Sequence, residues 1–244
     1  MKLAYDLHIH SCLSPCGAED MTPANIAGMA MLAGLQVIAV ADHNSCLNCP
    51  AVCKAAERLG LLAVPAMELT TAEEVHVLCL LPDLERAAEW SAFVREKLPD
   101  LRGDNRFFGP QMILDSEDHV LGQEERLLAS ASEIGIYDVH RLVAELGGIA
   151  LPAHIDRSSF SLLSNLGLYD PEMGFTMAEV SYSADRGALR KLPGLETLPF
   201  LSNSDAHDLF SIRDASLTIE PEEATPAGVI AWLSAQRNAQ NTLL

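Results

Sequence analysis

The sequence has few basic residues. Lysine and arginine number 16 against 34 aspartates and glutamates, and the formal net charge is −18 at pH 7. Such a chain repels polyanions, so we expect no basic surface for long nucleic acid and no duplex nucleic acid partner. If the substrate is a phosphate, bound cations must supply the attraction that basic side chains do not.

The sequence also has no long apolar run. No uninterrupted apolar stretch approaches the roughly 20 residues that span a bilayer, and residues 1–10 have the pattern of a polar-ended strand rather than a signal segment. With 15 glycines, 13 prolines and 49% hydrophobic residues, the composition excludes disordered, collagenous and low-complexity proteins. We predict one globular domain over residues 1–244, cytoplasmic and without a membrane partner. The oligomeric state is left open.

Short apolar runs alternate with amphipathic stretches. Strands are expected at 2–9, 37–41, 62–67, 75–81, 149–153, 177–181, 199–202 and 215–219. Helices are expected at 22–33, 51–58, 84–97, 124–133, 137–146 and 226–236. This alternation predicts an α/β fold of parallel strands, either a barrel or a doubly wound sheet, with its site beyond the carboxyl ends of the strands. The irregular stretch 99–125 is predicted to be an insertion or lid over that face.

Residues of the types that ligate metals follow or occupy these strands. They are His8, His10, His43, Glu68, His76, His154, Asp205 and His207. His8 and His10 share one face of a strand, because side chains alternate. A single buried histidine is usually a satisfied core residue, but six of the eight histidines fall in this set. Imidazole and carboxylate ligands suit Zn, Mn or Fe, and we expect two or three divalent ions with Glu68 as a bridge.

The motifs that contain these residues resemble those of the PHP (polymerase and histidinol phosphatase) family, in the same order over residues 5–207. They are Asp-Leu-His-Ile-His-Ser at 6–11, Ala-Asp-His-Asn at 41–44, Met-Glu at 67–68, Glu-Val-His-Val at 74–77, Pro-Ala-His at 152–154 and Ser-Asp-Ala-His at 204–207. The resemblance implies a distorted (β/α)7 barrel with a trinuclear metal centre that hydrolyses phosphate esters.

The resemblance also implies which residues hold each ion. His8, His10, Glu68 and Asp205 would hold the first, Glu68, His76 and His154 the second, and His43 and His207 the third. Asp42 matches a residue close to the site that supports a ligand or moves protons.

One departure from the family pattern concerns the third ion. The family usually has an aspartate or histidine five or six residues after the second histidine of the first motif, where this chain has Pro15 and Cys16. Proline cannot ligate. Either Cys16 is a thiolate ligand, or Glu19 or Asp20 reaches the ion, or the third site is weak or empty. A thiolate would favour Zn or Fe over Mn and Mg.

Five of the six cysteines lie in two short stretches after predicted strand ends. Four of them are candidates for an additional zinc or iron–sulfur site: Cys12, Cys16, Cys46 and Cys49. Burial as small hydrophobic residues is the alternative, and Cys53 fits it. Disulfides are not expected in a reducing cytosol.

Substrate contacts are indicated at two places. Arg157 and the hydroxyls of residues 158–159 follow His154, and Arg157 either binds phosphate oxygens or pairs with Asp156 or another carboxylate. The segment 102–111, with Asn105, Arg106 and the Phe107–Phe108 pair, either stacks on a ring of the substrate or packs internally.

The leading hypothesis is a metal-dependent phosphoesterase acting on a small phosphorylated molecule, a nucleotide or a short oligonucleotide. A metal-bound hydroxide would attack, with Asp42, His43 and Arg157 as the catalytic side chains. An amidohydrolase is the enzymatic alternative, although those barrels usually use a carboxylated lysine and no predicted strand here ends in one. A PHP-like accessory domain that binds metal without turnover is the non-enzymatic alternative. The ester and the identity and number of the metals are left open.

Overall fold

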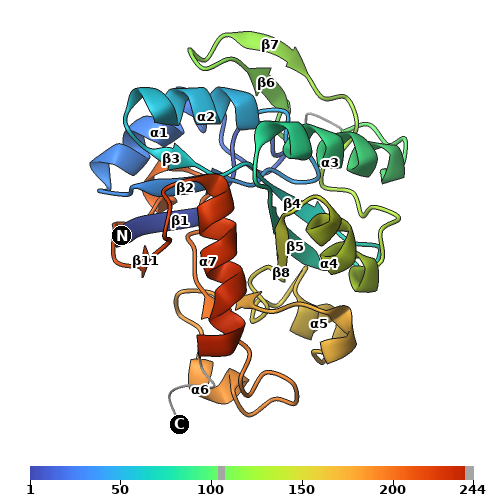
Figure 1. Cartoon of the computed structure of the whole chain (residues 1–244). Helices are drawn as coiled ribbons and strands as arrows, with labels where there is room; N and C mark the ends of the chain where they lie inside the picture. The colour runs from blue at the N-terminus through green and yellow to red at the C-terminus, as the bar shows by residue number, and fades with distance from the viewer. Residues whose placement is uncertain (104–107, 240–244) are drawn as a thin grey trace.

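The computed structural model describes residues 1–103 and 108–239, and Figure 1 shows its elements. The strands are β1 (Leu3–Ile9), β2 (Val37–Val40), β3 (Leu62–Ala63), β4 (Ala66–Thr70), β5 (His76–Leu80), β6 (Met112–Leu114), β7 (Val120–Gln123), β8 (Ile149–Pro152), β9 (Ala178–Glu179), β10 (Phe200–Leu201) and β11 (Thr218–Ile219). The α-helices are α1 (Pro23–Leu32), α2 (Cys49–Arg58), α3 (Leu84–Lys97), α4 (Ile136–Glu145), α5 (Leu162–Leu166), α6 (Arg186–Leu189) and α7 (Pro226–Ala239), with 3-10 turns at Pro171–Met173 and Leu209–Ser211.

The strands form four hydrogen-bonded sheets, with the orders β11-β1-β2-β3, β4-β5-β8, β9-β10 and β6-β7. β2 runs parallel to β1 and β3, and β9 runs parallel to β10, but β5 is antiparallel to both β4 and β8. The predicted α/β class is confirmed. The distorted (β/α)7 barrel is not found, because over the described residues these sheets do not close and their strands are not all parallel.

One apolar core nevertheless lies between the two larger sheets. Strand residues alternate between this inner core and the clusters under the helices, as strand geometry requires. The inner core includes Leu7 of β1, Ala39 of β2, Leu78 of β5, Leu151 of β8, Leu201 of β10 and Val229 of α7. Intervening residues such as Ile38 face α1 and α2, and Val77 faces α3 and α4. In Figure 1, α7 crosses the space between these sheets.

The alternation in β1 shifts by one residue at a bulge. Asp6 pairs with Ile38 but Ile9 pairs with Val40, so β1 has one more residue than its partner over this stretch. Leu7 belongs to the inner core, whereas Ile9 belongs to the outer cluster under α1. Bulges of this kind re-aim side chains, and this one lies between Asp6 and Ile9, the stretch that contains His8.

The predicted strand 62–67 is two strands because of Pro65. Proline has no N–H to donate, so the β2 pairing ends before it. Its carbonyl accepts a hydrogen bond from the N–H of Leu81 at 2.8 Å, and the chain then pairs with β5 instead of β2.

The helix predicted at 124–133 is wrong. β7 ends at Gln123, and the backbone that follows is bound by distant side chains. Gln111 donates to the carbonyls of Glu124 and Arg126 at 2.7 and 2.8 Å, and Asn44 donates to those of Leu128 and Ser130 at 2.7 and 2.9 Å. These carbonyls would otherwise accept bonds within the helix, so tertiary contacts override the local propensity.

The irregular stretch 99–125 contains the β6–β7 hairpin, which stands outside the two larger sheets in Figure 1. The side chain of Asn48 fixes the hairpin, accepting from Leu114 N at 3.0 Å and donating to the carbonyl of Met112 at 3.1 Å. Gly109 N donates to the carbonyl of Pro15 at 2.8 Å, which joins this stretch to the loop after β1. Its role as a lid stays a prediction.

None of the helices in the described part of the chain combines the length and the apolar character needed to cross a bilayer.

Truncating Leu78 should measure how much the inner core contributes to the stability of the fold. Leu78 is fully buried, so we expect Leu78→Ala to lower the free energy of unfolding by roughly 2–5 kcal/mol through lost burial and a cavity. Leu32→Ala is the matched control, because Leu32 is 77% exposed and its loss should cost less than about 0.5 kcal/mol. Urea unfolding of the metal-free protein gives both values. Equal effects would contradict this description of the core.

Candidate metal centre

Chain segments from both larger sheets bring the eight predicted ligands to one place. Six of these residues lie at or after the carboxyl ends of strands: His8, His10, His43, His154, Asp205 and His207. Glu68 lies within β4, and His76 is the first residue of β5. Because β5 runs against β4 and β8, its start lies at the edge where those strands end, with Thr70 opposite His76 and Pro152 opposite Val77.

Glu68 is the centre of the cluster. Its carboxylate, 1% exposed, has a nitrogen of five imidazoles within 3.4 Å. The distances are 3.4 Å from His8 Nε2, 3.2 Å from His10 Nε2, 3.1 Å from His43 Nδ1, 3.1 Å from His76 Nδ1 and 3.1 Å from His154 Nε2. Asp205 Oδ1 lies 3.0 Å from His10 Nε2 and 3.4 Å from His8 Nε2.

These contacts set the charge states. Burial alone would raise the pKa of Glu68, but His76, His8 and His43 hold it well below its ordinary value. Burial drives the pKa of His43 well below its usual range, and burial with the neighbouring His10 lowers the pKa of His207 to about 4. His43 and His207 are therefore neutral near pH 7, which is the form in which imidazole ligates metals.

Hydrogen bonds fix the tautomers of the first two histidines. His8 Nδ1 lies 3.0 and 3.1 Å from the two carboxylate oxygens of Glu179, which can only accept, so this nitrogen carries the proton. Ser14 Oγ donates to Asp42 Oδ1 at 2.6 Å, so His10 Nδ1, 2.9 Å away, must donate to Ser14. In the neutral rings, both Nε2 lone pairs therefore point at Glu68 and Asp205.

Asp42 does not face the cluster. Its carboxylate is 2% exposed and accepts from Ser11 N at 2.7 Å, from Ser11 Oγ at 2.6 Å and from Ser14 Oγ at 2.6 Å. It acts on His10 through Ser14, which makes it a positioning residue. The prediction that Asp42 moves protons at the reacting atoms finds no contact to support it.

Glu179, at the end of β9, was missed in the sequence. It is 2% exposed, orients His8, accepts from His154 N at 3.0 Å and accepts from Asn203 Nδ2 at 2.7 Å. It thus ties β1, β8 and the segment after β10 together at the cluster. The signal that was available is a carboxylate inside the apolar run 177–180, where an unpaired charge would be costly.

The residues present fit divalent cations. His43 Nδ1 and Asp205 Oδ1 are buried without a hydrogen-bond partner among the described residues. Despite burial, the neighbouring carboxylates raise the pKa of His8 and His10, so these contacts favour positive charge between the nitrogen and oxygen atoms, which lie 3.0–3.4 Å apart. A shared cation would supply that charge in place of the protons. Three groupings have ligand atoms within 4.8 Å of one another: His8, His10, Glu68 and Asp205; His43, Glu68 and His76; and His10, Cys16, His43 and His207. This donor set and the buried carboxylates point to divalent metals.

The backbone is strained at two members of the cluster. His154 has φ 30° and Asp205 has φ 51°, in the region that side-chain-bearing residues seldom adopt. Strain of this kind is concentrated at functional sites, where surrounding contacts maintain it. At His154 the contact is the hydrogen bond from its backbone N–H to Glu179.

The cysteines do not form a thiolate site of their own. No grouping of three or more ligating side chains over residues 1–103 and 108–239 contains two cysteines. Cys46 and Cys49 are buried in the apolar cluster under α3 and α4, in agreement with the alternative that these cysteines pack as small hydrophobic residues. The prediction of an additional metal site formed by Cys12, Cys16, Cys46 and Cys49 is therefore wrong. Cys16 is grouped instead with three histidines. Glu19 and Asp20 are exposed and belong to none of these groupings.

The cluster opens into a cavity of about 340 Å³. Arg157 and Ser159 line it, together with Phe108 and Phe160, and Phe160 stacks on His76 with ring centroids 4.9 Å apart. Arg157 forms an ion pair with Asp205 Oδ2, so the predicted alternative of pairing with a carboxylate is observed. The carboxylate is not that of Asp156, which accepts a hydrogen bond from Ser181 N. Two predicted contact residues, Asn105 and Arg106, lie outside the described residues, as does Phe107.

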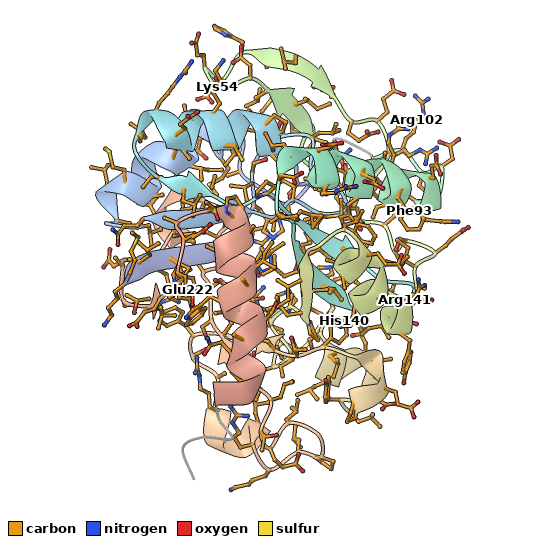
Figure 2. The ribbon with its side chains drawn as sticks, viewed as in Figure 1. Lys54, Phe93, Arg102, His140, Arg141 and Glu222 are labelled. Atoms are coloured by element: carbon orange, nitrogen blue, oxygen red, sulfur yellow. The ribbon has the colours of Figure 1, made fainter. Side chains whose placement is uncertain are left out.

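Charged side chains of both signs lie on the outer surface. Lys54, Arg102, Arg141 and Glu222, which are labelled in Figure 2, are all exposed. Beside the cluster, a second cavity of about 260 Å³ is lined by Arg157 and Arg213, and Arg213 lies over the ring of Tyr182 at 4.2 Å. Glu179 and Asp205 line the same cavity, so two carboxylates balance the two guanidinium groups there. His119 lies outside the cluster, is exposed and pairs with Asp115.

No protein-family model matches the chain, and no curated protein sequence matches it. Solved structures do match. The novel lesion-specific endonuclease PfuEndoQ from Pyrococcus furiosus has a TM-score of 0.66 and 20% identity, covering 96% of this chain and 56% of that one. This chain thus spans little more than half of that protein.

Two further matches are of similar length to this chain. A protein from Bifidobacterium adolescentis described as a metal-dependent phosphoesterase has a TM-score of 0.56 and 20% identity, covering 83% of this chain and 87% of its own. An amidohydrolase from Chromobacterium violaceum, with bound sulfate and no metal, has a TM-score of 0.61 and 21% identity, covering 96% of both chains. At these identities the likeness shows the fold.

The expectation of no duplex nucleic acid is contradicted. A structure of Endonuclease Q with a 27-mer duplex carrying an abasic lesion at its active site has a TM-score of 0.64 and 20% identity, covering 100% of this chain and 57% of that one. A protein of this fold can therefore hold a duplex. The net charge was a poor guide, because it is a sum over the whole chain and does not describe the charge at one site.

Replacing Glu179 should weaken metal binding without touching a ligand. In Glu179→Gln the partner of His8 loses its charge, and we expect the affinity for Zn²⁺ to fall roughly 10- to 100-fold. Competition with a chromogenic chelator measures this affinity. The control is Glu222→Gln, which alters an exposed glutamate and should change nothing. An unchanged affinity in Glu179→Gln would contradict the orienting role.

Proposed function

We propose that this protein is a metal-dependent phosphoesterase. The observation that carries the proposal is the buried Glu68 carboxylate, ringed by five imidazoles and open to a cavity that Arg157 borders. Imidazole and carboxylate donors suit Zn, Mn or Fe, and one carboxylate among several imidazoles suits a bridged multinuclear centre. We propose the ion assignment that the PHP resemblance implies, within one domain over residues 1–244.

The named activities of the three matching proteins support a hydrolase. They are a lesion-specific endonuclease, a metal-dependent phosphoesterase and an amidohydrolase, and the last holds sulfate, a tetrahedral anion like phosphate. No lysine lines the cavity among the residues described, so the carboxylated lysine usual in amidohydrolases has no counterpart here. This favours phosphate esters over C–N bonds.

The protein's own residues would hold the ions and position the substrate. When bound, the cations would neutralise phosphate oxygens, make water more acidic and offset charge on the leaving oxygen. Glu179 holds His8, and Asp42 holds His10 through Ser14, so the donor atoms are oriented before substrate arrives. His43 lies at the cavity wall and would assist as a ligand.

Arg157 would bind the phosphate. Its side chain is 44% exposed at the cavity and pairs with Asp205. A guanidinium has five N–H donors, so Arg157 can remain paired with Asp205 and still donate two parallel hydrogen bonds to phosphate oxygens. We therefore propose both roles, phosphate contact and a link to a metal ligand.

The cavity walls suggest an ester with a ring or other apolar group. Phe108 and Phe160 line the cavity of about 340 Å³, and the ring of Phe160 stacks on His76. The second cavity, which Arg157 also lines, has polar walls that include Tyr182, Ser204 and Arg213. Nucleotides and ends or lesions of nucleic acid combine both features and are the first substrates to test.

Metal removal should abolish hydrolysis. After treatment with a chelator we expect no release of phosphate, and addition of Mn²⁺ or Zn²⁺ should restore it. Glu68→Gln should remain more than about 100-fold less active even with metal, since losing a ligand's outer partner alone costs 10- to 100-fold. Glu172→Gln, at an exposed position, is the matched control. A colorimetric phosphate assay and gel analysis of labelled oligonucleotides provide the readouts.

The proposal fails if the metal-loaded protein hydrolyses no phosphomonoester, nucleotide, oligonucleotide or damaged duplex. In that case bound metal without turnover would favour the accessory-domain alternative.

Arg157 variants should separate its two roles. If Arg157 binds phosphate, Arg157→Ala should lower kcat/KM by about 10- to 100-fold, the range for one hydrogen bond to a charged group. Arg157→Lys should recover only part of this, because lysine keeps the charge and loses the fork. Arg141→Ala, on the outer face of α4, should have no effect. A change in metal affinity with unaltered kcat/KM at saturating metal would leave only the Asp205 role.

A further inference from the structure

The loop between β1 and α1 holds Cys16 beside the cluster. Gly17 N donates to the carbonyl of Ser14 at 3.0 Å, and Ala18 N donates to the carbonyl of His207 at 2.9 Å, so Cys16 lies in a tight turn attached to a histidine of the centre. A Cβ at Gly17 would lie 2.3 Å from the carbonyl oxygen of Ser11, so only glycine fits this turn.

Cys16 is one of four side chains grouped around one point. Ligand atoms of His10, Cys16, His43 and His207 all lie within 4.8 Å of one another. The His10 ring stacks on that of His207 with centroids 4.2 Å apart, and it lies 4.6 Å from that of His43. Cys16, His43 and His207 all line the 340 Å³ cavity.

The one nitrogen of His10 that could bind a cation faces Asp205 and Glu68. Its Nδ1 donates to Ser14, so only Nε2 can ligate, and Nε2 lies 3.0 Å from Asp205 Oδ1 and 3.2 Å from Glu68 Oε2. A cation shared with those carboxylates would take this lone pair. The remaining donors of the grouping are then Cys16, His43 and His207.

Two further observations point to a ligand at these three residues. His43 is 6% exposed, and its Nδ1, 3.1 Å from Glu68 Oε2, has no hydrogen-bond partner in the described structure, so this buried nitrogen is left for an ion between the two groupings that His43 joins. Three protein donors facing a cavity match the pattern of ions that keep one position open for water or substrate, unlike closed structural sites.

We propose that Cys16, as a thiolate, completes the site of a third cation held by His43 and His207, with its open position facing the cavity. The sulfur ligand makes this position selective for thiophilic ions such as Zn²⁺, Fe²⁺ or Co²⁺ over Mg²⁺ and Mn²⁺. The inference rests on the proposed metal centre and adds to it a difference in metal preference between neighbouring sites.

Binding at this site releases a proton. An ordinary cysteine thiol has a pKa of about 8.5, so it carries its proton at neutral pH. The incoming ion replaces that proton on sulfur, and the proton leaves to solvent.

Cobalt spectroscopy of the full chain tests the assignment directly. Thiolate bound to Co²⁺ gives an intense near-ultraviolet charge-transfer absorption that imidazole and carboxylate ligands do not give. Titration of the metal-free protein with Co²⁺ should produce this absorption, and Cys16→Ser should lose both the absorption and one equivalent of bound cobalt. Cys12→Ser is the matched control, since Cys12 lies in the same loop and in none of the ligand groupings of the described residues, and it should keep both.

A carboxylate at the same position provides the rescue. Cys16→Asp should regain the lost equivalent without the charge-transfer absorption and should bind Mn²⁺ there, because an oxygen ligand suits the harder ion. Circular dichroism of each variant confirms that it is folded. Charge-transfer absorption that persists in Cys16→Ser, or a fully loaded wild-type protein without it, would overturn the proposal.

These measurements need no substrate. If the absorption depends on Cys16 while no phosphate ester is hydrolysed, the inference stands and the proposed function fails. If hydrolysis is found but the absorption never appears, the proposed function stands and the inference fails.

Discussion

A negative charge buried at the meeting point of two sheets is the constraint on which the rest of this structure depends. Glu68 is 1% exposed, and removing a carboxylate from water without compensation costs several kcal/mol. The chain compensates it with five imidazoles drawn from four separate segments, so the strand ends must converge there. Protonated imidazoles or bound cations can supply the positive charge. Without metal, Asp205 and Glu68 raise the pKa of His10 to about 9 against the effect of its burial, while burial keeps His43 neutral.

A second layer of contacts keeps the donors aimed at that point. The bulge in β1 lies at His8, Glu179 fixes the tautomer of His8, and the Asp42–Ser14 pair does the same for His10. Each outer carboxylate is itself held by backbone N–H groups. The centre is therefore rigid before any ion binds, which lowers the entropy lost on binding.

Local patterns in the sequence were enough to find the residues that the structure brings together but not the residues that support them. Strand periodicity and strand ends indicate His8, His10 and His154, because those features are short-range. Glu179 and Ser14 act through partners far away in sequence or through a turn, and the helix predicted near Leu128 fails because Asn44 and Gln111 bind its backbone. The direction of each strand could not be predicted from local patterns either. β5 runs antiparallel to β4 because the chain leaves the β2 pairing at Pro65 and then returns through a short turn after β4. The α/β class could be predicted, and sheet closure could not.

That reversal affects the order in which the centre can assemble. A parallel crossover would separate Glu68 from the next strand by a helix, but the β4–β5 connection is a short turn in which Thr71 N donates to the carbonyl of Val75 at 3.0 Å. Glu68 and His76 are thus eight positions apart on one hairpin, a unit that forms within about 1–10 μs in peptides. Contacts between residues close in sequence tend to form early in folding. Glu68 and His76 can therefore come together before the more distant ligands arrive, and a cation could bind this pair while the rest of the chain is still folding.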